Sequence, residues 1–556
     1  MSLKNEIAEV LEKIADILDF KGENRFKVAA YKNGANTIRR INGDIESKIS
    51  DGSIANIKGI GKGLLSVIND FYSHRESTEL KKLQESIPLG IGDLFSIRGL
   101  GSKKIKLLFD SLNISDLESL EHACKNNELI NISGFSQKTQ ENILKEIKRI
   151  KSTSAMMLLP FALERAQQLI NDIKDIEVVE KIEFTGELRR QNEVINKIEL
   201  ILLTNNYDEL LNSLAKLLVF YELDKFTSYH LLNIVSSDNK IIKIYVTEDE
   251  NRYNHTLFRT TGSEEFLKEL KISEDAKNEN DCFRQNGLPY VAPPMREKQY
   301  FDAPEKLRTQ SNIFLSDFKG LLHFHTDWSD GQNTLAEMLS EAENLGFEYA
   351  AVCDHSKSAF YANGLSKEQI LKQKVEIDLL NSSQDITIFH GIESDILNNG
   401  SLDYDNDFMH TFDFVTASIH SNFNMSETEM TARTIKAIES PFTDLFAHPT
   451  GRLLLRRKGY SLNIKKILDA CAANDVAIEI NASPFRLDLD WRNIYYAREI
   501  GCKFAINPDA HSTAGISNIK YGIMVAQKAG LQKSELINHY TEKEFISFIN
   551  RKVNRK

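Results

Sequence analysis

The chain has 556 residues, of which 41% are hydrophobic and 27% are charged. This length exceeds what one hydrophobic core supports and predicts about three to five domains. No apolar run approaches the roughly 20 residues of a membrane helix, and the N-terminus lacks the basic start and cleavage site of a signal peptide. We therefore expect a cytoplasmic protein with no membrane partner. The five cysteines form no CxxC pair, which argues against a disulfide framework or a thiolate zinc site.

Charge is unevenly distributed along the chain. The net charge of −11 by itself argues against a nucleic-acid ligand. Residues 1–150, however, hold 23 Lys and Arg against 21 Asp and Glu, a net of +2, so the rest of the chain carries −13. An acidic second part is typical of carboxylate-rich cation binding, although a solvated acidic surface has the same composition.

The first 150 residues predict short amphipathic helices joined by a repeated glycine hairpin. The repeat occurs at 57–62 (IKGIGK), at 97–104 (IRGLGSKK) and more weakly at 132–138 (ISGFSQK). Two glycines around an apolar residue make a tight turn, and the following helix begins with unpaired N–H groups beside Lys side chains. A turn before a solvated helix is the alternative interpretation, but the repetition favours helix-hairpin-helix motifs that hold the nucleic-acid backbone without reading sequence. The predicted contacts are Gly59, Gly61, Lys62, Gly99, Gly101 and Lys103.

The remainder of the chain predicts two further kinds of architecture. Strands such as 197–203 and 240–246 alternate with helices from about 155 to 310, and a proline-containing stretch at 287–297 then leads into a polar linker. From about Lys319, buried strands separated by helical segments predict a parallel β/α barrel. These strands are 350–353, 414–417, 477–480 and 504–506.

Metal-ligating side chains follow the predicted barrel strands. They are His323, His325, Asp330, His355, Glu393, His420, His448, Asp509 and His511, and they include six of the thirteen histidines. A single histidine after a strand is more often a hydrogen-bonded rim residue than a ligand, but the carboxyl ends of barrel strands converge, so the whole set predicts one site.

The ligand types indicate the chemistry of this site. Imidazoles and carboxylates without thiolates suit Mn, Zn or Fe in a hydrolytic site, and nine ligands predict two or three divalent cations. Such clusters clamp a phosphate and supply a metal-bound hydroxide as nucleophile. Arg452 and Arg456, with Arg457, follow His448 and are candidate phosphate contacts, although a solvated basic face explains them equally well.

These motifs resemble a known domain. HxH…SDG, DHS, GIE, SIHS, HPTGR and PDAHS, in this order from about 319 to 556, are similar to the PHP (polymerase and histidinol phosphatase) domain. The resemblance implies a distorted parallel β/α barrel with a trinuclear metal site for phosphoester hydrolysis, in which Glu393 is the best candidate to bridge two ions.

The order of domains resembles the bacterial family X DNA polymerases, which join a polymerase-beta-like core to a PHP domain. The resemblance implies five domains: an N-terminal helical DNA-binding domain at 1–85, a second, fingers-like helix-hairpin-helix domain at 86–152, an α+β nucleotidyltransferase-like palm at 153–235, a thumb-like domain at 236–312 and the PHP domain at 318–556. Supporting stretches include 26–31 (FKVAAY), 260–263 (TTGS) and 287–297.

The palm departs from the family's pattern. The family has paired aspartates on a strand and a third aspartate later, and here Lys197 and Glu199 match the pair while Lys243 matches the third. Nucleotidyl transfer needs carboxylates that bridge two Mg²⁺ ions, which lysines repel. We therefore expect an inactive polymerase site. Asp238 lies nearby and is interpreted as a turn residue, and 5′-deoxyribose phosphate lyase activity stays undecided.

The sequence thus predicts a DNA-repair hydrolase, acting as a 3′-5′ exonuclease or an abasic-site endonuclease on single-stranded, gapped or abasic DNA, and we expect a monomer. The alternatives are a gap-filling polymerase whose PHP domain proofreads, a phosphatase of small monoesters similar to histidinol phosphatase, and a non-catalytic DNA scaffold.

Overall fold

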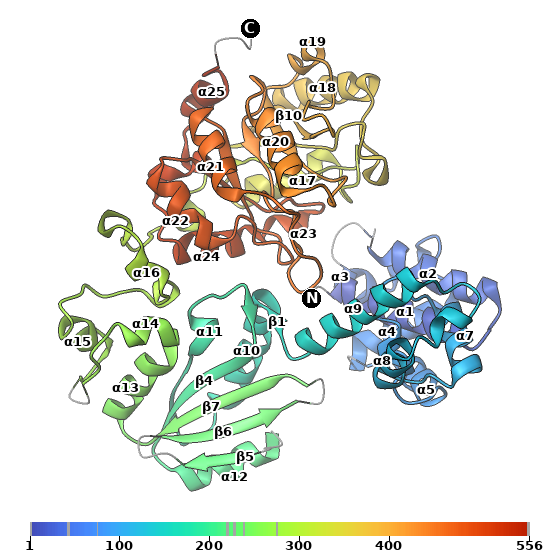
Figure 1. Cartoon of the computed structure of the whole chain (residues 1–556), viewed down its shortest axis with the longest axis vertical. Helices are drawn as coiled ribbons and strands as arrows, with labels where there is room; N and C mark the ends of the chain where they lie inside the picture. The colour runs from blue at the N-terminus through green and yellow to red at the C-terminus, as the bar shows by residue number, and fades with distance from the viewer. Residues whose placement is uncertain are drawn as a thin grey trace. The chain divides into compact units, whose positions relative to one another are not determined.

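The computed structural model of the chain describes residues 3–39, 41, 45–74, 76–217, 222–225, 229–236, 239–273 and 276–552. The chain divides into two compact units, Met1–Ser154 and Ala155–Lys556. Figure 1 shows the first unit as helices and the second as a mixed sheet followed by a barrel. No helix among the described residues is long and apolar enough to cross a membrane.

The first unit is helical, as predicted. Its α-helices are α1 (Leu3–Phe20), α2 (Arg25–Arg39), α3 (Ile45–Ser50), α4 (Lys62–His74), α5 (Thr78–Glu85), α6 (Ile91–Leu94), α7 (Ser102–Leu112), α8 (Leu117–Lys125) and α9 (Gln137–Thr153). One apolar cluster joins buried residues between Leu3 and Leu83, and a second joins Phe20 to buried residues between Ile91 and Ile147. The two clusters follow the order of the two predicted helical domains, whose exact limits stay a prediction.

The second unit begins with a mixed five-stranded sheet in the order β2-β4-β7-β6-β5. Its strands are β2 (Val179–Phe184), β4 (Lys197–Thr204), β5 (Glu222–Lys225), β6 (His230–Val235) and β7 (Ile241–Thr247), beside the short pair β1 (Met157–Leu158) and β3 (Val194–Ile195). The associated helices are α10 (Leu159–Ile173), α11 (Gly186–Arg189) and α12 (Tyr207–Leu217). Strands β4 and β7 are parallel neighbours and the other pairs are antiparallel. This is the α+β arrangement expected for a palm, and its sheet includes β7, which lies beyond the predicted palm limit at residue 235.

Short helices form the segment that follows the sheet. They are α13 (Glu250–Thr261), α14 (Glu264–Lys268), α15 (Glu279–Arg284) and α16 (Gln299–Asp302). Arg189 of α11 donates two hydrogen bonds to the Glu279 carboxylate, at 2.7 and 3.0 Å, and the fully buried Arg296 donates to the same group. Since buried charges are tolerated only when paired, this cluster fixes the helical segment against the sheet.

The C-terminal barrel confirms the predicted parallel β/α architecture. Seven strands lie in the order β14-β13-β12-β11-β10-β9-β8, and every neighbouring pair is parallel. They are β8 (Gly320–Leu321), β9 (Tyr349–Val352), β10 (Thr387–Asp395), β11 (Phe414–Ser418), β12 (Leu445–Phe446), β13 (Ala477–Asn481) and β14 (Phe504–Asn507). A parallel bridge between Phe324 and Ala510 joins the two edges, so the barrel is nearly closed.

Helices cover the outside of the barrel. They are α17 (Leu335–Asn344), α18 (Lys367–Asn381), α19 (Asn406–Met409), α20 (Glu427–Ile438), α21 (Ile464–Ala473), α22 (Trp491–Glu499), α23 (Thr513–Ile516), α24 (Ile519–Lys528) and α25 (Glu542–Ile549). All five cysteines of the chain are buried and free, as expected for reduced core residues.

Charged side chains connect the barrel to the palm-like sheet within the second unit. Lys528, at the end of α24, is 1% exposed and donates to the backbone oxygens of Arg190 and Pro294 and to the Glu297 carboxylate. Glu193 accepts hydrogen bonds from the Trp491 indole N–H and from Arg492 of α22. The barrel and the palm therefore share a buried polar interface.

Candidate metal centre

Eight of the nine predicted ligand positions lie at or just after the carboxyl ends of barrel strands. His323 and His325 follow β8, His355 follows β9, Glu393 lies near the end of β10, and His420 follows β11. His448 follows β12, and Asp509 and His511 follow β14. Asp330 reaches the same place from the turn after His325. Because parallel strands point the same way, these side chains converge although they are up to 188 residues apart (323 to 511).

Glu393 is the centre of the cluster. It is 1% exposed and is surrounded by five imidazoles. Its Oε1 lies 3.0 Å from His448 Nε2 and 3.3 Å from His420 Nε2. Its Oε2 lies 2.8 Å from His355 Nδ1, 3.6 Å from His325 Nε2 and 3.7 Å from His323 Nε2. Each carboxylate oxygen thus faces a different set of imidazoles, which is the arrangement a bridging ligand requires.

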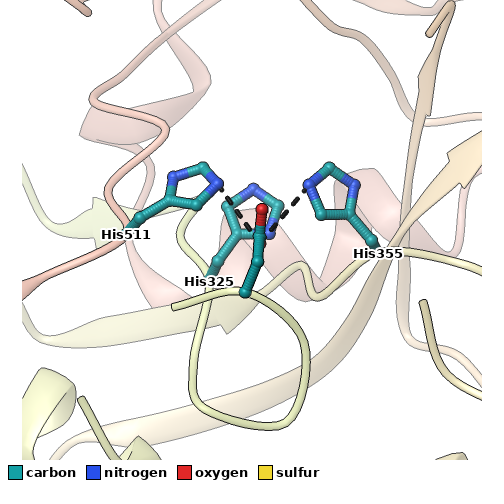
Figure 2. Close-up of side chains that lie close together, drawn as sticks. His325, His355 and His511 are labelled. Atoms are coloured by element: carbon teal, nitrogen blue, oxygen red, sulfur yellow. Dashed lines mark ion pairs between the residues drawn. The ribbon is translucent and has the colours of Figure 1, made fainter. Parts of the chain in front are cut away.

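Three overlapping groups of side chains bring their ligand atoms within 4.8 Å of one another. The groups are His325, Asp330, His355 and His511; His323, His325 and Glu393; and His355, Glu393 and His420. Figure 2 shows the rings of His325, His355 and His511 gathered around one point. His448 and Asp509 belong to none of these groups, but His448 contacts Glu393 and Asp509 Oδ1 lies 3.1 Å from His325 Nε2. The structure therefore brings all nine predicted residues into one network.

Several buried polar atoms in this network have no hydrogen-bond partner. They are His323 Nε2, His325 Nδ1, His355 Nδ1, His448 Nδ1 and Glu393 Oε2; His355 Nδ1 and Glu393 Oε2 lie 2.8 Å apart as an ion pair but make no hydrogen bond. A buried polar group without a partner costs about 1–3 kcal/mol, so a set of them needs an explanation. Except for His325 Nδ1 and His448 Nδ1, these atoms lie on the sides of their groups that face the cluster. Nitrogen and oxygen donors without protein partners fit divalent cations, as the ligand types predicted.

Two carboxylates that sequence reasoning missed orient the predicted ligands. Glu479, fully buried on β13, accepts a hydrogen bond from His323 Nδ1 at 2.6 Å, and Asp395 accepts one from His420 Nδ1 at 2.6 Å. An imidazole that binds a metal through one nitrogen commonly donates its other N–H to a carboxylate. A signal for both existed, since Glu479 interrupts an apolar strand and Asp395 lies two residues after Glu393 on the same face of β10.

The charges of the cluster shift the pKa values of its members. Burial opposes the charge on His420, yet Glu393 and Asp395 raise its pKa to about 10. Burial also opposes ionisation of Glu393, yet His420 and His355 bring its pKa well below the ordinary value. His325 shows the opposite balance, because burial and the neighbouring His511 and His355 lower its pKa to about 3. The carboxylates therefore favour positive charge at this place.

The backbone is strained at two of the nine positions. His448 has φ 28° and Asp509 has φ 51°, although neither is glycine. Such conformations are uncommon for residues with a Cβ and occur often at functional sites, where the surrounding structure holds them. At both positions the unusual backbone follows directly after a barrel strand and turns the side chain toward the cluster.

The predicted arginine contacts are placed differently from one another. Arg452 donates to the backbone oxygens of Arg486 and Leu487 and to Asp490, which occupies its guanidinium away from the cluster. Arg456 is exposed, and its guanidinium lies 4.2 Å from the centre of the Phe485 ring. Arg486, which sequence reasoning did not consider, lies beside the cluster; its Nε is 3.8 Å from Asp509 Oδ2.

The three residues matched to the polymerase carboxylates, Lys197, Glu199 and Lys243, lie together on the palm-like sheet. Glu199 and Lys243 are paired across the parallel strands β4 and β7. Lys197 Nζ lies 2.8 Å from Glu199 Oε1, and the Tyr245 hydroxyl donates to the same oxygen at 2.9 Å. A Cβ on Gly186 would lie 2.0 Å from Glu199 Oε2, so the carboxylate is enclosed on that side too. Asp238 lies outside the described residues.

The hairpins of the first unit have the predicted form. Gly59 and Gly99 have φ values of 101° and 80°, and helices α4 and α7 begin within three residues of them. The apolar residues between the paired glycines, Ile60 and Leu100, are buried and anchor each turn. The predicted contacts Gly59, Gly61, Lys62, Gly99, Gly101 and Lys103 are all exposed, so their backbone and ammonium groups are available to a ligand.

Comparison with known proteins identifies a domain family at each end of the chain. The helix-hairpin-helix domain family matches residues 2–77, and the PHP domain family matches residues 322–483. The DNA polymerase/3′-5′ exonuclease PolX of Bacillus subtilis (strain 168) is 31% identical over an alignment of 586 positions that covers 99% of each chain. Probable phosphatases of Thermoanaerobacter sp. (strain X514) and Acetivibrio thermocellus are 27% and 25% identical over 39% and 42% of this chain, and 88% and 95% of their own.

Proposed function

Since the chain belongs to the bacterial family X DNA polymerases, we propose that it is a DNA-binding, metal-dependent phosphodiesterase of DNA repair whose chemistry takes place in the barrel. The activity is a 3′-5′ exonuclease, an abasic-site endonuclease, or both. The observation that carries this proposal is the convergence of buried, unpartnered imidazole and carboxylate atoms around Glu393.

The residues present fit a cluster of two or three Mn, Zn or Fe ions. The residues that would hold them are His323, His325, Asp330, His355, Glu393, His420, His448, Asp509 and His511. Glu393 belongs to two of the three ligand groups described above. When bound, the ions supply Lewis acidity that polarises a phosphodiester and lowers the pKa of water. The chain's own contribution is positioning, because Glu479 and Asp395 hold the Nδ1–H groups of His323 and His420 and leave each Nε2 facing the cluster.

Arg486 supports substrate binding at this site better than the predicted Arg452 and Arg456. Its guanidinium stands beside Asp509 at the cluster and is 18% exposed, so it can reach a phosphate, whereas Arg452 is held by protein acceptors. Arg456 is exposed and free to approach a more distant phosphate of the same strand.

The palm, by contrast, supports the proposal that polymerase activity is absent. In the match made from the sequence, Lys197 and Lys243 take the places of the family's metal-binding aspartates, and the Lys197 ammonium lies 2.8 Å from the Glu199 carboxylate. Among the described residues, every group of three or more potential metal ligands lies in the barrel. A metal ion at Glu199 would have to displace the ammonium group of Lys197.

The helix-hairpin-helix motifs would bring DNA to the chain. Exposed N–H groups at the starts of α4 and α7, beside Lys62 and Lys103, suit backbone phosphates and make no demand on base identity. We expect such binding for single-stranded, gapped and abasic DNA, with the chain acting as a monomer.

Incubation of the purified chain with Mn²⁺ and end-labelled single-stranded, gapped and abasic DNA, with and without dNTPs, tests the proposal. We expect shortening of the DNA that is lost in His323→Ala/His325→Ala, and no primer extension. Degradation that survives the double substitution would place the activity elsewhere. Primer extension that disappears in Glu199→Gln would instead establish the alternative of an active gap-filling polymerase, and competition by small phosphomonoesters would favour a phosphatase.

A further inference from the structure

The loop between β9 and α18 exposes two adjacent aromatic side chains. Phe360 and Tyr361 lie in the short 3-10 helix η6 (Phe360–Ala362) and are 86% and 67% exposed. Exposed apolar residues are normal when scattered singly, but two large exposed rings at consecutive positions of one turn are unusual, and we call them the aromatic surface.

Tyr361 places this aromatic surface at the border of the proposed metal cluster. The Tyr361 ring centre lies 6.1 Å from the His355 ring and 6.1 Å from the His420 ring. Both imidazoles contact Glu393. A group attached by one sugar to a phosphate at the cluster is therefore within reach of the Tyr361 ring, and Phe360 is the next residue on the same exposed turn.

The loop that carries the rings is firmly held. Asp403 accepts hydrogen bonds from Ser358 N and Ser358 Oγ at 2.7 and 2.6 Å. The Tyr404 hydroxyl donates to Leu365 O at 2.6 Å, and a Cβ on Gly364 would come within 1.9 Å of Ser356 O, so the two ends of the loop are closely packed. The two rings are thus presented to solvent by a loop anchored at both ends.

We propose that Phe360 and Tyr361 stack on the nucleobase of the nucleotide whose phosphodiester lies at the cluster, so that the substrate is an unpaired, base-bearing strand end. This inference rests on the proposed nuclease function. Every base presents a flat π-face to an aromatic side chain, which makes such stacking independent of sequence. A base inside a duplex is already stacked and paired, so it must leave the helix before it can reach these rings.

The proposal separates the two activities left open above. An abasic site has no base to stack, so an abasic-site endonuclease would gain nothing from these rings. A 3′-5′ exonuclease would gain from them at every step, since each terminal nucleotide offers a new base. The aromatic surface therefore favours the exonuclease.

The test uses the full chain with Mn²⁺ and two 5′-labelled single strands that differ only at the 3′-terminal nucleotide, which carries either a base or an abasic tetrahydrofuran. We expect the base-bearing strand to react about 5- to 150-fold faster, the range that corresponds to about 1–3 kcal/mol of stacking. Phe360→Ala/Tyr361→Ala should bring this ratio close to one, while Tyr361→Phe and the control Phe314→Ala, a 59% exposed ring before the barrel, should preserve it.

A binding measurement keeps the inference independent of hydrolysis. A strand with 2-aminopurine at its 3′ end and a cleavage-resistant phosphorothioate at the last linkage should lose fluorescence on binding, because stacking quenches 2-aminopurine. The quenching should be absent in Phe360→Ala/Tyr361→Ala and present in Phe314→Ala. Equal rates on both strands, or quenching that survives the double substitution, would overturn the stacking proposal. Failure of the wild-type chain to hydrolyse either strand would overturn the nuclease function, and the fluorescence would still report on stacking.

Discussion

Replacing Glu479 with Gln should weaken the barrel and its cation binding together. The Glu479 carboxylate is fully buried and accepts four hydrogen bonds. His323 Nδ1 and Asn507 Nδ2 donate to Oε1 at 2.6 and 3.1 Å, and His448 N and Asn481 Nδ2 donate to Oε2 at 2.8 and 3.1 Å. An amide nitrogen at either oxygen position would face two donors and accept from neither.

The size of the effect follows from this count. At least two hydrogen bonds to a charged acceptor are lost, each worth about 1.5–3 kcal/mol, so the free energy of unfolding should fall by roughly 3–6 kcal/mol. Because the carboxylate also orients His323, cation affinity should fall by about 10- to 100-fold.

Tryptophan fluorescence can follow the stability change in urea, because both tryptophans of the chain, Trp328 and Trp491, lie in the barrel. Titration with Mn²⁺ measures the affinity. The matched control is Glu376→Gln on α18, whose carboxylate accepts from the Trp328 indole outside the cluster and should leave Mn²⁺ affinity unchanged. Wild-type Mn²⁺ affinity in Glu479→Gln would refute the positioning role argued above.

Three further results are expected. Burial opposes ionisation of Glu279, but Arg189 and Arg296 bring its pKa to about 2 from 4.5. The ionised Glu279 therefore contributes about 3 kcal/mol to the free energy of unfolding, which is present above pH 4.5 and is lost as the pH falls through 2. The difference in unfolding temperature between wild type and Glu279→Gln should shrink over that pH range. Lys62→Ala and Lys103→Ala should each make the salt dependence of DNA binding shallower. In a fluorescence anisotropy titration, the magnitude of the slope of log association constant against log salt concentration should fall by about 0.7–0.9 for each variant, and an unchanged slope would contradict the phosphate contact. Removal of divalent cations with EDTA should abolish hydrolysis and lower the unfolding temperature of the barrel, since cations at 100 times their Kd stabilise by about 2.7 kcal/mol; equal melting curves with and without EDTA would contradict a bound cluster.

The sequence predicted the architecture because its patterns have direct structural causes. Glycine hairpins before basic helices and buried strands before histidines each impose a local geometry, so the helical unit and the parallel barrel were both expected. The convergence of His323 with His511 followed from the common direction of the strands. The limits of the domains between 86 and 312 had no comparable signal and stay predictions.

What the sequence could not give were contacts that depend on three-dimensional packing. Nothing in the chain order shows that Glu479 lies beside His323, 156 residues earlier. Arg452 was predicted as a phosphate contact from its place after His448, but its guanidinium finds acceptors in Asp490 and two backbone oxygens. The positions of Arg486 and Tyr361 beside the cluster were not predicted either, because an isolated arginine or tyrosine in a loop carries no periodic pattern.

The buried ammonium of Lys528 makes the barrel depend on the palm and on the segment after it. Its three acceptors all belong to the palm and the segment after it, and burial lowers its pKa to about 8. A barrel expressed alone would expose the Lys528 ammonium and the side chain of Trp491 to water, because their partners in the palm and in the segment after it would be missing. A palm without catalytic power would still support the barrel, because it shields the Lys528 ammonium and supplies an acceptor for it.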